Sequence, residues 1–251
     1  MVNQSDIEIL YRFIPALVHI HHELQIENFK SEQSHLRKLF AGLNEINQRK
    51  LIYIKEHAPY FNIFQILRYG HYETRLHTPF LVHLLSPDGH HQLENQFFKL
   101  FIDTIFNKSF EISEFKKIEV NEEFQATGLE GRIDIYIRFL YKTEIYLVAI
   151  ENKINAYDQE AQLSRYFDYL IKKGIRTENI RLIYLTKFGD KPSIPYSIEE
   201  EEFNRLQNEG ILKLVSYKTN ISEMINRLLQ RKNPNAVNEV LKQYLSTINS
   251  I

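Results

Sequence analysis

The sequence predicts an α/β protein whose mixed central β-sheet is flanked by helices and preceded by an N-terminal helical extension. Three patterns support this fold class. Apolar residues recur at helical spacing through the first 57 residues, and two β-rich runs follow one another at 132–140 and 144–154. A strand–helix–strand unit then occupies 145–186, which predicts two parallel strands joined by a right-handed crossover.

The N-terminal extension contains two amphipathic segments, residues 6–29 and 33–57, with apolar side chains at steps of three and four. Pro15 is expected to kink the first segment or to mark a later start. We expect residues 1–58 to form a helical hairpin whose apolar seam packs on the rest of the protein. A partner or dimer interface is the alternative use of the same seam.

The remaining residues, 59–251, are predicted to form one α/β domain with closing C-terminal helices. Thr78 before Pro79 is typical of a helix start, and Gly174 is typical of a helix end. Asp158 is expected to cap the crossover helix. The expected elements are helices at 62–67, 79–85 and 93–105, strands at 117–126, 132–140 and 144–154, a helix at 158–172, strands at 181–186 and 211–217, and helices at about 220–231 and 235–248.

Composition narrows the class of protein. The 251 residues carry a net charge of −1 and no cysteine, which excludes disulfides, thiolate zinc sites and cysteine nucleophiles and fits a reducing cytoplasm. No apolar run of about eighteen residues is present, so no membrane span is expected. The balanced charge does not itself indicate nucleic acid. Residues 211–251 have a local basic excess, which suits either phosphate contact or a solvated helical face.

Charged residues interrupt the two β-rich runs. Glu151 and Lys153 end the second run two residues apart, so their side chains point to the same face of the strand. The preceding residues 146–150 are apolar, which predicts a strand buried on both faces. An acid and a lysine are costly to bury there unless they are paired or bind something. Strand pairing is expected to bring Asp134, from the first run, close to both.

This arrangement resembles the PD-(D/E)XK nuclease superfamily, which has a restriction-endonuclease-like core. Asp134 in RIDIYI matches the first acid of the motif, and Glu151 and Lys153 in AIENKI match its acid-x-Lys half. Ile133 stands where a proline is usual. Gln162 and Tyr166 resemble the Gln and Tyr that follow the catalytic lysine in one branch of the superfamily.

A closer resemblance is to an uncharacterised bacterial family within the superfamily, over roughly residues 60–190. The upstream segment of that family carries an E-x-x-x-H pattern, matched here by Glu73 and His77, followed by FLVHLLSPDGHH. A helix before the sheet often supplies another acidic ligand in the superfamily. The resemblance therefore makes Glu73 a further candidate, with a plain surface salt bridge as the alternative.

The resemblance implies metal-dependent hydrolysis of phosphodiester bonds by an endo- or exonuclease, with DNA as the expected partner. Mg²⁺ is the expected cofactor, with Mn²⁺ as a substitute, because hard cations prefer carboxylate and carbonyl oxygens. The candidate catalytic residues are Asp134, Glu151, Lys153 and Glu73. The candidate metal ligands are the carboxylates of Asp134, Glu151 and Glu73 and the carbonyl of Ile150.

Gln162 and Tyr166 lie one helical turn apart, so they are expected to act together on the substrate backbone or on the lysine. Two other function classes remain open. One is a catalytically silent nuclease fold that binds nucleic acid without cutting it, and the other is a protein-interaction component of a defence or mobile-element system. A homodimer is compatible with any of these classes. A buried Glu151–Lys153 ion pair without catalysis is the structural alternative.

Overall fold

The structure, a computed structural model, describes the backbone of residues 4–251 and the surroundings of side chains at 13, 15–27 and 29–251. The chain divides into two compact units, residues 1–61 and 62–251. Each unit is described by itself. No helix among the described residues is both long enough and apolar enough to cross a membrane.

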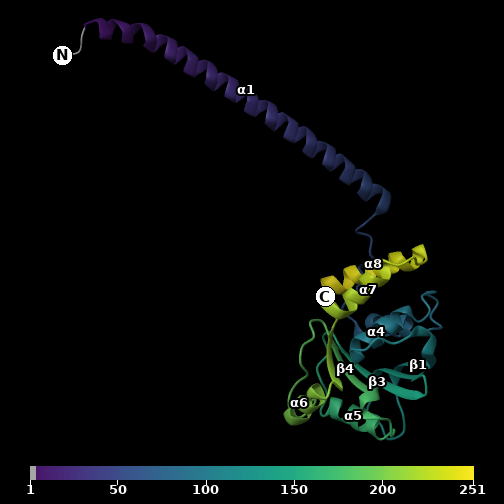
Figure 1. The fold of residues 1–251 in the computed structure, drawn as a ribbon. Helices are drawn as coiled ribbons and strands as arrows, with labels where there is room; N and C mark the ends of the chain where they lie inside the picture. The colour runs from purple at the N-terminus through teal and green to yellow at the C-terminus, as the bar shows by residue number, and fades with distance from the viewer. Residues whose placement is uncertain (1–3) are drawn as a thin grey trace. The chain divides into compact units, whose positions relative to one another are not determined.

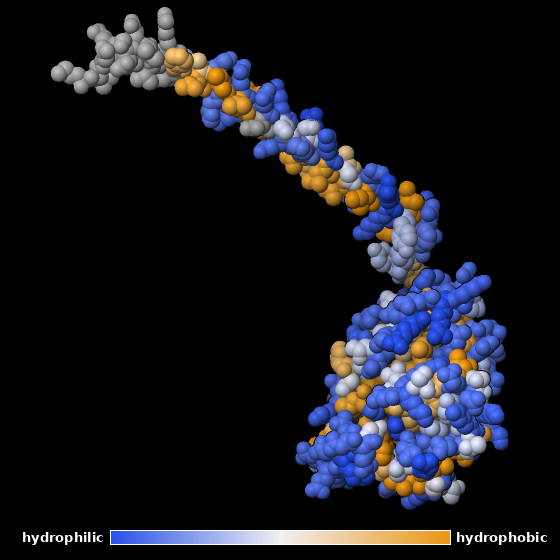
Figure 2. Space-filling model, viewed as in Figure 1, coloured by the Kyte–Doolittle hydropathy of each residue, from blue (hydrophilic) through white to orange (hydrophobic). Residues whose placement is uncertain are grey.

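The first unit is built on one helix, α1 (Gln4–His57), which runs through Pro15 without a break. The hairpin predicted here is not formed, because the helix continues through residues 29–33, which contain neither glycine nor proline to stop it. Hydrophobic side chains are exposed along α1 (Figure 2). Leu17, Leu36 and Phe40 are among them. The packing of residues 1–58 on the core stays a prediction.

The second unit contains a five-stranded sheet in the order β1-β2-β3-β4-β5. The strands are β1 (Phe115–Phe124), β2 (Ile133–Tyr141), β3 (Glu144–Lys153), β4 (Ile180–Thr186) and β5 (Leu212–Ser216). The first three strands pair antiparallel, whereas β3, β4 and β5 run parallel. The predicted mixed sheet is confirmed, and β3 joins its antiparallel half to its parallel half (Figure 1).

Strand β3 is buried on both faces, as its apolar run indicated. Val148 and Ile150 belong to one hydrophobic cluster, while Leu147 and Ala149 belong to the other. This alternation follows from the two-residue period of a strand. Each face of the sheet therefore needs its own covering layer of helices.

Helices cover both faces of the sheet (Figure 1). On one face, side chains of α3 (Thr78–Leu85), α4 (Gln96–Phe106), α7 (Ser222–Leu229) and α8 (Asn235–Ser250) build an aromatic-rich core. On the other face lie α5 (Gln162–Ile171) and α6 (Glu200–Asn208). The short elements are α2 (Ile63–Ile66), the π-helical turns η1 (Glu73–His77) and η4 (Tyr217–Ile221), and the 3₁₀ turns η2 (Ile112–Glu114) and η3 (Thr177–Asn179).

The crossover helix α5 begins at Gln162, four residues after the predicted start. Asp158 does not cap it, because its carboxylate accepts hydrogen bonds from the Tyr184 hydroxyl at 2.9 Å and the Ser193 backbone N–H at 2.7 Å. Ala161, in the left-handed region at φ 48°, separates the loop from the helix. Residues 154–161 therefore form a loop between β3 and α5.

Candidate active site

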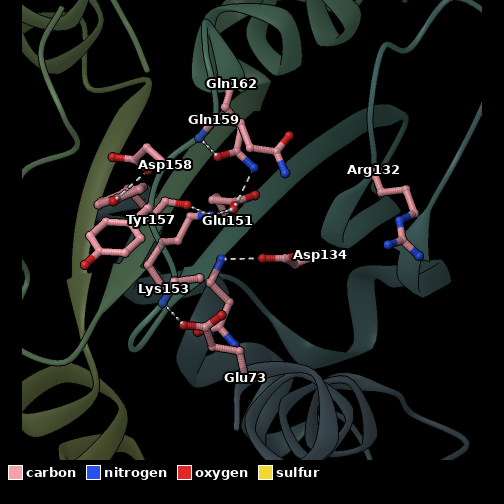
Figure 3. A network of polar contacts seen from close by, with 12 residues as sticks. Glu73, Arg132, Asp134, Glu151, Lys153, Tyr157, Asp158, Gln159 and Gln162 are labelled. Atoms are coloured by element: carbon pink, nitrogen blue, oxygen red, sulfur yellow. Dashed lines mark hydrogen bonds and ion pairs between the residues drawn. The ribbon is translucent and has the colours of Figure 1, made fainter. Parts of the chain in front are cut away.

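A cleft of about 710 Å³ opens where β1, β2 and β3 meet η1 and the start of α5. Its lining includes Glu73, Asp134, Glu151, Lys153 and Gln162, which come from four different elements (Figure 3). The structure thus brings these five predicted site residues to one cleft, whereas His77, Ile150 and Tyr166 are not among the residues that line it.

The pairing of β2 with β3 positions the two acids. Ile135 lies opposite Ile150, so the next residues along the antiparallel pair, Asp134 and Glu151, are level with each other. Alternation directs Asp134, Glu151 and Lys153 to the face of the sheet that α5 covers. The register of one hairpin therefore places two carboxylates and an ammonium group side by side.

Glu151 is only 2% exposed, and its two carboxylate oxygens have different surroundings. Oε1 accepts from Lys153 Nζ at 2.7 Å and from Gln162 Nε2 at 2.7 Å. Oε2 is buried and has no hydrogen-bond partner among the described residues. A buried carboxylate oxygen without a partner is unfavourable and marks a position for a ligand.

The electrostatics of the cleft disfavour two ionised acids. Burial is the main cause that raises the pKa of Asp134 to about 6. The hydrogen bond that its carboxylate accepts from the Asn152 N–H acts in the opposite direction and lowers this pKa. Burial and the nearby Asp134 raise the pKa of Glu151 to about 8, although the positive charge of Lys153 lowers it. Although burial opposes its charge, Glu151 holds the pKa of Lys153 above the ordinary value. A further positive charge would stabilise both carboxylates.

The residues present fit a hard divalent cation. Asp134 and Glu151 supply two carboxylates, and Mg²⁺ is commonly held by one or two carboxylates together with water. Within the described part of the chain, no three His, Cys, Asp or Glu side chains converge closely enough to form a full protein cage. The unpartnered Oε2 of Glu151 and the raised pKa of both acids are the observations that favour a cation here.

Glu73 lies at the cleft but has a structural role as well. Its Oε1 accepts the backbone N–H groups of Ile154, Asn155 (2.7 Å) and Ala156 (2.9 Å). These three hydrogen bonds fix the loop that leaves β3 directly after the lysine. A role for Glu73 as a metal ligand stays a prediction.

Gln162 and Tyr166 form the α5 side of the site, and both are buried. Gln162 Nε2 donates to Glu151 and, at 3.1 Å, to the Tyr166 hydroxyl, which in turn donates to the carbonyl of Arg132. The pair therefore orients Glu151 and anchors the start of β2. Their predicted contact with substrate stays a prediction.

Asn152, between the acid and the lysine, was not singled out from the sequence, although it holds three elements together. Its backbone N–H donates to Asp134 Oδ2 at 2.7 Å, and its Nδ2 donates to Thr78 Oγ1 at 2.9 Å. Its Oδ1 accepts from the Tyr217 hydroxyl at 3.1 Å. The available signal was a polar residue on the same face of β3 as Val148 and Ile150, which face the aromatic-rich core.

His77 and Ile150, the two remaining residues predicted from the sequence, are buried in the core. His77 accepts from the Tyr244 hydroxyl through Nδ1, and its Nε2–H donates to the Gly70 carbonyl. Burial lowers the pKa of His77 to about 4, so the ring is neutral and serves to tie η1 to α8. The side chain of Ile150 is fully buried in the core, and the role of its carbonyl as a ligand stays a prediction.

The fold and the cleft together define a class of protein: a mixed α/β sheet that carries an acid on one strand and an acid-x-Lys sequence on the next. A family model described as PD-(D/E)XK nuclease superfamily matches residues 61–246. The chain belongs to the PD-(D/E)XK nuclease superfamily. Searches of curated proteins and of solved structures found no match.

Proposed function

We propose that this protein is a metal-dependent nuclease that hydrolyses phosphodiester bonds, with DNA as its substrate. The observation that carries the proposal is the shared cleft of Asp134, Glu151 and Lys153, in which one buried carboxylate oxygen of Glu151 lacks a partner. Membership of a nuclease superfamily supports the same activity.

Asp134 and Glu151 would hold the metal, with Mg²⁺ as the expected ion and Mn²⁺ as a substitute. The carbonyl of Ile150 and the second oxygen of Glu73 are the further candidate ligands. A bound divalent cation activates water and neutralises charge on the phosphate. The chain's own contribution is to hold the two carboxylates level across β2 and β3 and to keep Gln162 on Glu151.

Lys153 supplies the positive charge that the protein itself brings to the reaction. Its Nζ is held by Glu151 Oε1 at 2.7 Å and by the Tyr157 carbonyl at 3.2 Å, so the ammonium group is fixed at the edge of the cleft. A preorganised charge at this position stabilises the negative charge that develops on the phosphate during hydrolysis. It also orients the attacking water.

The test is a cleavage panel on the purified chain, with single-stranded DNA, duplex DNA and RNA, each in Mg²⁺, Mn²⁺ or EDTA. We expect cleavage of DNA in either metal and none in EDTA. Asp134→Asn and Lys153→Ala should lose cleavage, whereas Lys172→Ala, at an exposed lysine beyond α5, should keep it. A wild type that binds nucleic acid but cuts none of it in either metal would replace this proposal by a silent binding module.

A further inference from the structure

Three loops gather at the carboxyl ends of the parallel strands, beside the proposed active site. Lys153 pairs with Thr186 of β4, and Thr186 pairs with Ser216 of β5, so the last residues of the three strands are level. The residues that follow each strand therefore emerge at one edge of the sheet. In open α/β sheets this edge is where ligands bind.

Direct contacts tie the three loops together. Lys153 Nζ donates to the Tyr157 carbonyl at 3.2 Å, and Lys187 Nζ donates to Asn155 Oδ1 at 2.8 Å. The backbone N–H of Lys218 donates to the Lys187 carbonyl at 3.1 Å. The loop after β3 is fixed further by the three backbone N–H groups that Glu73 accepts. The loops thus form a continuous, ordered surface that begins at Lys153.

Two aromatic rings on this surface are left in water. The side chain of Tyr157 is 93% exposed and that of Phe188 is 64% exposed, although both belong to loops held by the contacts above. Tyr157 lies beside Lys153 through its backbone, because its carbonyl accepts from Lys153 Nζ at 3.2 Å (Figure 3). Aromatic side chains contribute most when they are covered, so two exposed rings beside the proposed active site are available to stack on a ligand.

Lysines accompany the rings. Lys187 precedes Phe188 in the chain, and Lys218 Nζ lies 5.7 Å from the centre of the Phe188 ring. Lys187 donates to a neutral amide and Lys218 to the neutral carbonyl of Asn249. Neither lysine forms a salt bridge within the part of the chain that the structure describes. We call Tyr157, Lys187, Phe188 and Lys218 the aromatic–basic strip.

Rings alternating with unneutralised ammonium groups match the chemistry of unpaired nucleotides. A base that is free of its complement offers a face for stacking, and its phosphate offers a negative charge, whereas a duplex keeps its base faces covered by one another. We propose that the aromatic–basic strip binds unpaired nucleotides, so that the enzyme selects single-stranded nucleic acid or the unpaired part of a branched substrate. The inference rests on the proposed function only in placing the scissile phosphate of that strand in the adjacent cleft.

The test is equilibrium binding by fluorescence anisotropy in EDTA, so that no cleavage takes place. The probes are a labelled single-stranded DNA of mixed sequence without self-complementarity and a blunt duplex of the same length. Removing one aromatic side chain should weaken binding of the single strand at least about fivefold, because stacking of one base on one ring contributes about 1–3 kcal/mol. The double variant Tyr157→Ala/Phe188→Ala should therefore bind the single strand about 25-fold more weakly than wild type.

The matched control is Tyr157→Phe/Phe188→Tyr, which keeps both rings and should bind within about twofold of wild type. Duplex binding should change by less than about twofold in either double variant. Circular dichroism should show the same fold for all three proteins, since both positions are exposed. Wild type that binds duplex as tightly as single strand, or an alanine variant that weakens both probes equally, would overturn the proposal.

A parallel cleavage assay in Mg²⁺ separates this inference from the proposed nuclease activity. If wild type binds the single strand through the two rings but cuts no DNA or RNA, the strip stands and the nuclease proposal fails. If wild type cuts DNA while the alanine variant binds and cuts as well as wild type, the nuclease proposal stands and the strip fails.

Discussion

Replacing Asp134 by Asn should stabilise the metal-free protein even as it removes metal binding. Asp134 is partly buried next to Glu151, and this burial raises the pKa of its carboxyl from 3.8 to about 6. The folded protein thus binds a proton at pH values where the unfolded chain has lost it. Stability therefore falls as pH rises through the interval from about 4 to 6, and it stays lower above that interval.

The magnitude follows from the two pKa values. One pKa unit corresponds to about 1.4 kcal/mol, so ionised Asp134 costs the metal-free fold about 3 kcal/mol at pH 8 and about half as much at pH 5. An asparagine has no charge to bury, and its side-chain oxygen still accepts the Asn152 N–H that now bonds Asp134 Oδ2. The advantage of Asp134→Asn should thus grow with pH.

Urea unfolding of wild type and Asp134→Asn in EDTA, at pH 5 and pH 8, measures this difference directly. Added Mg²⁺ should stabilise wild type and leave the variant unchanged, because a ligand that binds only the folded state raises the free energy of unfolding by RT ln(1 + [L]/Kd). A variant that is less stable than wild type at pH 8 in EDTA would refute the electrostatic account of the cleft. So would an equal gain from Mg²⁺ in both proteins.

Three further substitutions test separate contacts of the site. Lys153→Ala should reduce the cleavage rate by about 10²–10³ while calorimetry still detects metal binding, because it removes a preorganised charge and no carboxylate. Gln162→Leu should move the pH midpoint of cleavage upward, since it removes the hydrogen bond that Glu151 Oε1 accepts at 2.7 Å; an unchanged midpoint would argue against positioning by α5. Tyr217→Phe should lower the free energy of unfolding by about 1 kcal/mol in urea titrations, because Asn152 Oδ1 loses a buried donor.

The sequence predicts the sheet and the centre of the site because both depend on local periodicity. Two adjacent β-rich runs define β2 and β3, and the two-residue period of β3 puts Glu151 and Lys153 on one face. An antiparallel hairpin then leaves few registers for Asp134, and the observed register sets it level with Glu151. These features need only neighbouring residues in the chain.

Features that depend on distant residues could not be predicted in this way. The wrong hairpin prediction is the exception, because its signal was local: residues 29–33 contain neither glycine nor proline, and α1 continues through both amphipathic segments. Asp158 has a typical helix-capping side chain, but its carboxylate accepts hydrogen bonds from the Tyr184 hydroxyl and the Ser193 backbone N–H instead. The backbone contacts of Glu73 and the bonds of Asn152 to Thr78 and Tyr217 likewise join segments remote in sequence.

The measurement that tests the central claim most directly is the single-turnover cleavage rate of a labelled DNA at pH 8, for wild type and Asp134→Asn, in Mg²⁺ and in EDTA. The account predicts cleavage by wild type in Mg²⁺ and no cleavage above background in the other three combinations. Equal cleavage by both proteins in Mg²⁺, or cleavage by wild type that persists in EDTA, would contradict a metal-dependent nuclease site at Asp134 and Glu151.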